Sequence, residues 1–237
     1  MNPLSGVLSE AWDLYRRHAV HFLLISFVIY LAVAVVSAIL TAVLGGFGTF
    51  LGQILSVFGM FLLQAALVKA VQDVRDGRVD LTVSRTMEAV TPVVAGVALA
   101  SILASIAIGI GLILLIVPGL ILATYLSLIV PFIVVGGVPP LSSFGASWRT
   151  VTGYGWHVFG TYVVTFLVLI VANIVLSVIL LALPGAARTF LSQVISGTLV
   201  APFIACVVTL IYFRLTAAHA ETPGQDSGAP VELNRPS

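Results

Sequence analysis

The chain alternates long apolar stretches with short polar segments. A helix needs roughly 17 to 25 predominantly apolar residues to cross the hydrocarbon core of a bilayer, which is about 30 Å thick. Six stretches of the 237-residue chain meet that requirement. They cover residues 21–44, 50–71, 93–117, 120–138, 158–183 and 190–213. The pattern therefore predicts an all-α membrane protein with six transmembrane helices.

The stretch 120–138 is the least regular of the six. Pro131 removes one backbone hydrogen bond from any helix that contains it. Gly136 and Gly137 shorten the part of the stretch that favours a helix. We expect this segment to cross the membrane, but the pattern leaves open a kink at Pro131 or a re-entrant segment that does not cross.

Three polar segments precede the first, third and fifth stretches and have the apolar spacing of amphipathic helices. Each begins with a leucine followed by a hydroxyl residue suited to an N-cap: Leu4-Ser5, Leu81-Thr82 and Leu141-Ser142. We expect three interfacial helices, each followed by a transmembrane hairpin. This unit would occur three times, over residues 4–71, 81–138 and 141–213. Unrelated amphipathic connectors would produce the same pattern, so both interpretations stay open.

Composition and charge agree with a membrane location. Apolar residues make up 60% of the chain and charged residues 8%, whereas soluble domains carry roughly 25% charged residues. With six crossings, nine of the ten basic residues fall on one side and only Arg188 on the other. Since short cytoplasmic loops are enriched in Lys and Arg, we expect both termini in the cytoplasm. The abundance of Arg, Ala, Val and Gly favours a bacterial plasma membrane.

The same composition bounds the domain organisation and the partners. Residues 1–215 form one predicted membrane domain, and the Pro- and Gly-containing segment 216–237 has the composition of a disordered cytoplasmic tail. The formal net charge of +1 gives no basic excess that would favour nucleic acid. We expect membrane lipids as partners, together with a membrane protein or further copies of the chain.

Two segments resemble a known family. Residues 111–122 place Pro118-Gly119 between two apolar runs, and residues 144–156 lead from Ser147-Trp148 through glycines into the next apolar stretch. They resemble the membrane domain fused to some glycerophosphoryl diester phosphodiesterases and its stand-alone bacterial relatives. The resemblance implies an integral membrane protein of undefined activity. It does not imply phosphodiesterase catalysis, because the catalytic barrel has no counterpart here. An acidic residue common near the end of the family's fourth span is replaced by Gly136-Gly137.

Candidate site residues fall into two groups. Basic side chains at the expected interface suit a lipid headgroup phosphate, although ordinary positive-inside anchoring is the simpler interpretation. These residues are Arg16, Arg17, Arg149 and His157. Amide side chains inside the spans suit a polar solute path, although hydrogen bonds between helices are the simpler interpretation; they are Gln64, Asn173 and Gln193. No Asp, Glu, Lys or Arg lies in the interior of a predicted span, which disfavours proton-coupled transport.

The chain has no nucleophile elbow, His-rich metal motif or Gly-rich phosphate loop. We therefore expect no catalytic residues, no metal and no cofactor. The predicted function is a non-catalytic scaffold that interacts with lipids or a partner protein, and the alternative is a permease for an apolar or zwitterionic solute or lipid. A third hypothesis is an enzyme that uses Asp73, Asp76, Asp80 and His157, but we expect those acids to be a solvated connector.

Overall fold

The computed structural model describes residues 3–77, 83–182 and 185–220, with the side chains of residues 83, 182 and 185–197 left out. Its regular elements are all helical. They are α1 (Val7–Arg17), α2 (Ala19–Arg75), α3 (Val83–Leu114), α4 (Ile116–Tyr125), α5 (Ile129–Val134), α6 (Pro140–Val151), α7 (Gly155–Ile179), the 3-10 turn η1 (Leu180–Ala182) and α8 (Gly185–Ala220). Five segments of the described chain are long and apolar enough to cross a membrane. This confirms the prediction of an all-α protein with several helices able to cross a membrane.

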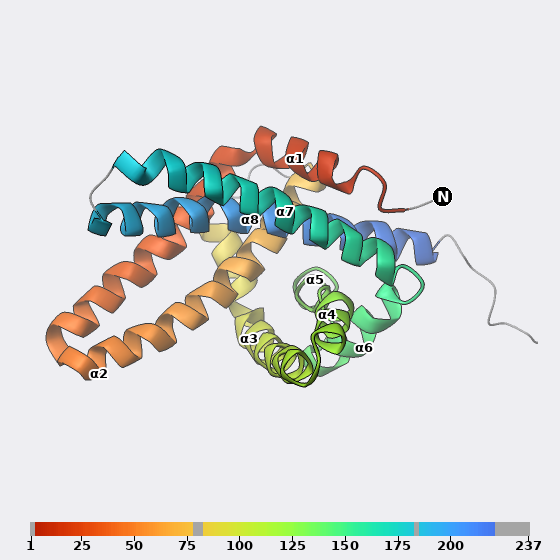
Figure 1. Cartoon of the computed structure of the whole chain (residues 1–237). Helices are drawn as coiled ribbons and strands as arrows, with labels where there is room; N and C mark the ends of the chain where they lie inside the picture. Colours follow the sequence, from red (N-terminus) through yellow and green to blue (C-terminus); the bar gives the residue numbers. More distant parts are fainter. Residues whose placement is uncertain (1–2, 78–82, 183–184, 221–237) are drawn as a thin grey trace, which may run out of the picture.

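The first two apolar stretches form one hairpin within α2. Gly45 interrupts the helix with φ 58° and ψ −131°, a conformation that glycine adopts without a steric penalty. The two arms then run back along each other (Figure 1), and Ser37 Oγ donates a hydrogen bond to the carbonyl of Gly52 at 3.4 Å. The closed end of this hairpin falls in residues 45–49, which separate the first two predicted stretches.

The polar segment before the third stretch is not a separate surface helix. The described part of that segment and the stretch itself form the single helix α3, with Pro92 inside it. Thr86 and Val90 are fully buried, and α3 packs against α2 along this face. Because the polar segment is buried against α2, it continues into α3 as one helix. We had expected it to form a separate helix on the membrane surface.

The prolines of α4 and α5 lie near the starts of these helices instead of ending them. The turn after α3 falls at Leu115, which is extended (φ −161°, ψ 139°), and Pro118 lies in the first turn of α4. Likewise the chain breaks at Leu126–Leu128, and Pro131 lies in the first turn of α5. A first-turn proline costs little because its missing N–H would have no partner in the helix. The structure thus interrupts the fourth stretch at Leu126–Leu128, just before the Pro131 at which the sequence left open a kink, and it turns at Leu115, just before Pro118-Gly119.

The C-terminal part consists of α6, α7 and α8. α6 is the third predicted amphipathic helix, and α7 and α8 lie side by side (Figure 1). α8 extends to Ala220, since Leu215 is fully buried and Thr216 Oγ donates to the carbonyl of Tyr212. Residues 216–220 are therefore helical, contrary to the predicted disordered tail. The rest of that tail lies outside the described residues.

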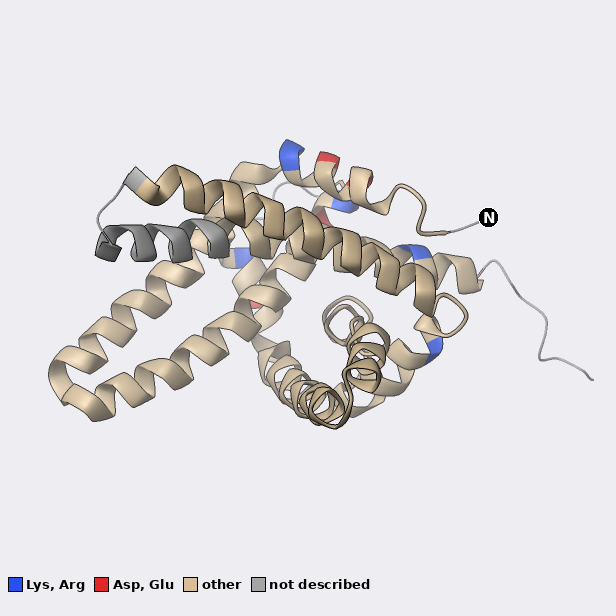
Figure 2. Ribbon diagram, in the orientation of Figure 1, with Lys and Arg blue, Asp and Glu red and all other residues tan. Residues whose placement is uncertain are grey.

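The helices converge on one packed region, which we call the junction. Its larger core cluster combines α1, both ends of α2, the α4–α5 break, the start of α7 and the second half of α8; Phe22, Leu67, Leu128, Val158 and Leu210 are each 0–1% exposed. A second cluster joins α2, α3 and α5. Charged residues gather around the junction, whereas residues 18–68 and 89–148 contain none (Figure 2).

α1 lies along α8 instead of standing apart on a surface. Leu4, Val7, Ala11 and Tyr15 are buried, and α1 packs chiefly against α8. The rings of Trp12 and Tyr15 meet that of Phe203 edge-on, at centroid distances of 6.3 and 6.1 Å. The predicted apolar face of this amphipathic helix is confirmed, and its partner is the last helix of the chain.

Candidate functional site: an apolar groove and the polar contacts of the junction

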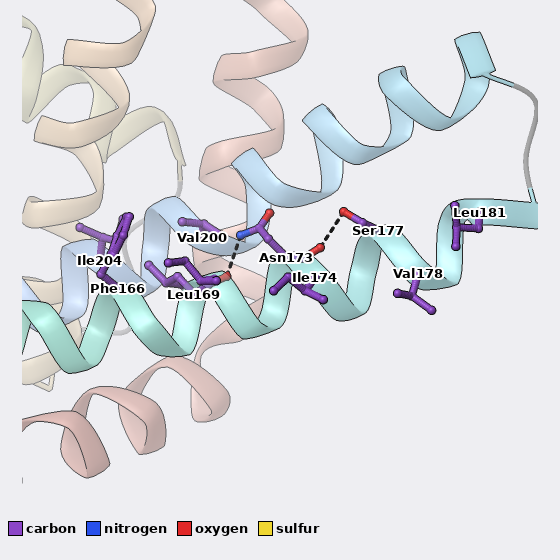
Figure 3. A pocket seen from close by; sticks show the side chains of 10 residues that line it. Phe166, Leu169, Asn173, Ile174, Ser177, Val178, Leu181, Val200 and Ile204 are labelled. Atoms are coloured by element: carbon purple, nitrogen blue, oxygen red, sulfur yellow. Dashed lines mark hydrogen bonds between the residues drawn. The ribbon is translucent and has the colours of Figure 1, made fainter.

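An apolar groove of about 590 Å³ lies between α7 and α8 (Figure 3). Among the residues whose side chains are described, eight apolar and two polar ones line it: Phe166, Leu169, Ile170, Asn173, Ile174, Ser177, Val178, Leu181, Val200 and Ile204. At 1.5 Å per residue the lining from Phe166 to Leu181 extends over roughly 22 Å, about two thirds of the hydrocarbon thickness of a bilayer. The groove therefore follows the direction in which α7 would cross a membrane.

The polar groups of the groove donate to their own helix. Asn173 Nδ2 donates to the carbonyl of Leu169 at 2.9 Å, and Ser177 Oγ donates to the carbonyl of Asn173 at 2.8 Å. Outside the groove, α7 exposes large apolar side chains such as Val171 and Val175. The described lining and the exposed face of α7 beside it thus present mainly hydrocarbon.

The predicted amide path is distributed over separate helices. Asn173 lines the groove, whereas Gln64 is exposed on the second arm of α2. Gln193 belongs to α8, but its side chain lies outside the described part of the chain. α7 packs against α8, with smaller contacts to α4 and α1. Gln64 and Asn173 therefore stand on different helices, and Gln64 is not among the described residues that line the groove.

The predicted headgroup residues are all exposed at the junction. Arg16 and Arg17 end α1, and Arg149 lies in the last turn of α6. His157 lies in the first turn of α7. Arg16 forms an exposed ion pair with Asp13 at 3.8 Å. The four side chains therefore lie on three helices, with Arg16 and Arg17 on α1, Arg149 on α6 and His157 on α7.

A buried ion pair is a feature that the sequence did not predict. Lys69 Nζ lies 3.1 Å from Asp73 Oδ1 and donates to Gln72 Oε1 at 2.9 Å. Asp73 is only 3% exposed, and its Oδ2 has no hydrogen-bond partner. The expectation that Asp73 belongs to a solvated connector was therefore wrong, while Asp76 is exposed as expected. Asp80, from the same enzyme hypothesis, lies outside the described residues.

Arg214 on α8 binds the N-terminal segment through hydrogen bonds and an ion pair. Its guanidinium donates to the carbonyls of Pro3 and Ser5 and forms an ion pair with Glu10. Nearby, burial raises the pKa of the Tyr15 phenol above its ordinary value of 10.0, with a smaller contribution from Cys206. The phenol therefore stays neutral in the α1–α8 contact. In the sequence Arg214 is only one of the nine basic residues on the expected cytoplasmic side, because its partners lie more than 200 residues away along the chain.

Ser147 joins the two sides of the α4–α5 break. Its hydroxyl donates to the carbonyl of Tyr125 at 2.6 Å and accepts the backbone N–H of Leu128 at 3.2 Å. Trp148, the next residue, packs on Tyr125 with ring centroids 4.4 Å apart. A helix break in an apolar environment leaves backbone groups that must find partners, and α6 supplies them. The Ser-Trp pair, which the sequence marked only as a family feature, therefore has this structural role.

Among the described residues, no three His, Cys, Asp or Glu side chains gather in a way that could hold a metal ion.

Comparison with known families gives one assignment. Comparisons with curated proteins and with solved structures found no match. A family model described as a domain of unknown function, DUF7847, matches residues 8–221. This match covers all the helices from α2 to α8 and nearly all of α1. It does not link the chain to the glycerophosphoryl diester phosphodiesterase membrane domain, so that resemblance stays a prediction. The chain belongs to the DUF7847 family, whose domain covers the whole helical part of the molecule.

Proposed function

We propose that this protein is a non-catalytic integral membrane scaffold whose hairpins bind lipids or a partner membrane protein. The supporting observation is the division between a packed junction and exposed apolar hairpins. Ile113 is 86% exposed, Val43 73% and Phe166 66%. Soluble proteins rarely expose apolar surface of this extent. In a membrane, lipid tails or the apolar face of another membrane protein would cover this exposed apolar surface.

The proposed location is a bacterial plasma membrane with the junction on the cytoplasmic side. The charged residues around the junction support this orientation, because charges are costly in the hydrocarbon core and Lys and Arg concentrate in the cytoplasm. Arg16, Arg17, Arg149 and His157 would contact lipid headgroups from this side. Their exposure supports the role.

Native mass spectrometry after gentle extraction tests the scaffold proposal. We expect a phospholipid, a partner protein or further copies of the chain to remain bound at low collision energy. Replacing Arg16, Arg17 and Arg149 by Gln together should reduce the retention of anionic lipid. A bare monomer that retains nothing would contradict the scaffold, and unchanged lipid retention in the triple variant would contradict the headgroup contacts.

The alternative function is a permease, and the α4–α5 break favours it. Discontinuous helices at the centre of a membrane protein often supply backbone groups for substrate binding. α5 packs against α2, α3, α6 and α8, and Ile129, Val130, Pro131 and Ile133 are buried. Uptake of small zwitterionic solutes into reconstituted vesicles, lost on Asn173→Leu, would support the permease. No flux across a broad solute panel would contradict it.

A further inference from the structure

We propose that the α6–α7 corner, residues 148–157, binds the headgroup of an anionic phospholipid. Arg149 and His157 contact the phosphate, and Trp148 and Trp156 lie at the depth of the glycerol backbone. This inference rests on the proposed membrane location. It adds the class of lipid and assigns that lipid to this corner instead of to α1.

The corner is a tight connection between two helices. Gly153 has φ 89°, a conformation that favours glycine, and the Tyr154 N–H donates to the carbonyl of Val151 at 2.9 Å. The His157 N–H in turn donates to the carbonyl of Tyr154 at 2.9 Å. The last turn of α6, which carries Arg149, and the first turn of α7, which carries His157, are therefore held close together.

Tyr125 supports the aromatic side of the corner. Its ring centroid lies 4.4 Å from that of Trp148, and its hydroxyl would lie 2.8 Å from a Cβ added to Gly155. The next residue, Trp156, packs on Phe159 at a centroid distance of 5.8 Å and is still 83% exposed. Packing thus fixes two indole rings that remain accessible. Accessible indoles beside basic residues are typical of a membrane–water interface.

The exposed half of α6 consists of an apolar row and a polar row. Leu141 and Trp148 are seven residues apart, hence on one side of the helix, and are 68% and 42% exposed. Ser142 and Arg149, also seven residues apart, are exposed along the adjacent side. At an interface, such a helix directs its apolar row toward lipid tails and its polar row toward headgroups. This orientation brings Arg149 to the depth of the phosphates.

The charge of the corner favours an anionic ligand. Arg149 is the only Asp, Glu, Lys or Arg in residues 89–187, and residues 89–220 contain no acidic residue. In the described part of the chain, no carboxylate forms an ion pair with Arg149. A guanidinium matches the geometry of phosphate oxygens and can bind two of them at once. The corner therefore offers an exposed cation that a lipid phosphate can neutralise.

The basic end of α1 differs in this respect. Arg16 and Arg17 share their helix with Glu10 and Asp13, so the helix carries as many acidic as basic residues. Arg16 already forms an ion pair with Asp13 at 3.8 Å. We therefore expect the corner, and not α1, to select anionic over zwitterionic lipid.

Fluorescence quenching of the full chain in phospholipid vesicles tests the proposal. The chain has three tryptophans, so in a Trp12→Phe background the two that remain both report on the corner. Phosphatidylglycerol with brominated acyl chains is mixed with ordinary phosphatidylcholine, and the reverse mixture is the reference. We expect quenching to show about a fivefold preference for phosphatidylglycerol, equivalent to about 1 kcal/mol of binding free energy.

Arg149→Gln combined with His157→Gln should reduce this preference to less than about twofold. Arg149→Lys keeps the positive charge and should retain most of the preference. The matched control is Arg16→Gln combined with Arg17→Gln, which removes two exposed charges from α1 and should leave the preference unchanged. All four positions are exposed, so these variants disturb no packed side chain.

Three outcomes would overturn the proposal. Equal quenching by the two brominated lipids would mean that the corner does not select the anionic headgroup. A preference that survives the loss of both Arg149 and His157 would exclude these side chains as its source. A preference lost in the α1 variant would assign the anionic lipid to α1. Lipid still quenches the tryptophans in all three, whereas neither brominated lipid would quench them if the proposed membrane location failed.

Discussion

At the residue scale, polar side chains in this apolar protein have specific partners, and the Lys69–Asp73 pair is the most deeply buried ion pair that we describe. Lys69→Met should reduce the free energy of unfolding by about 3–5 kcal/mol, because the Asp73 carboxylate would stay buried without its counter-charge. Thermal or denaturant unfolding in detergent measures this loss. The exposed neighbour Asp76 provides the control, and Asp76→Asn should change stability little.

The combined variant Lys69→Met with Asp73→Leu should recover most of that loss, since an apolar pair of similar volume avoids the desolvation of two charges. If Lys69→Met alone left stability unchanged, the carboxylate would not depend on the lysine, and our assignment of the pair would be wrong.

Ser147 provides a second prediction at this scale. Ser147→Ala removes the acceptor of the Leu128 N–H and the donor to the Tyr125 carbonyl. Leaving buried backbone groups without partners should cost about 1–3 kcal/mol of unfolding free energy. Hydrogen exchange should accelerate at residues 126–129 while α1 and α2 stay protected. Ser142→Ala, at an exposed position of the same helix, is the matched control and should have neither effect.

At the scale of elements, close approach between helices determines the geometry of the α2 hairpin. A Cβ added to Gly48 would lie 1.8 Å from the carbonyl oxygen of Leu40, whereas one added to Gly46 meets nothing within 4 Å. Gly48→Ala should therefore separate the two arms near their closed end, and Gly46→Ala should not. The distance between spin labels at Ile39 and Val57, both exposed on opposite arms, reports the separation. An unchanged distance in Gly48→Ala would contradict this packing.

At the scale of the whole molecule, the arrangement predicts which parts face each side of the membrane. In a Cys206→Ser background, Thr49→Cys at the closed end of α2 should react with a membrane-impermeant maleimide on intact cells. Ser142→Cys in α6 should react only after permeabilisation. The reason is that the junction carries the charged residues, which do not cross the hydrocarbon core readily. The reverse labelling pattern would show that the termini lie outside.

The sequence by itself determined the helical class, the membrane character, the closed end of α2 and the apolar face of α1. These depend on local properties, namely the length of apolar runs, the conformational freedom of glycine and the spacing of polar residues. Only the tertiary structure decided how the helices break and pair. It placed the breaks at Leu115 and Leu126–Leu128, continued α3 through its polar start, and buried Asp73.

The physical reason is that helices which are apolar on every face carry little information about which face meets which neighbour. Contacts such as Arg214 with Glu10, or Ser147 with Leu128, join residues that are distant along the chain. The groove between α7 and α8 arises in the same way, because its shape depends on how two nearly uniform apolar surfaces meet. Local sequence therefore determines the helical and apolar character of each segment. Packing between residues that are distant along the chain determines where the segment lies and what it can bind.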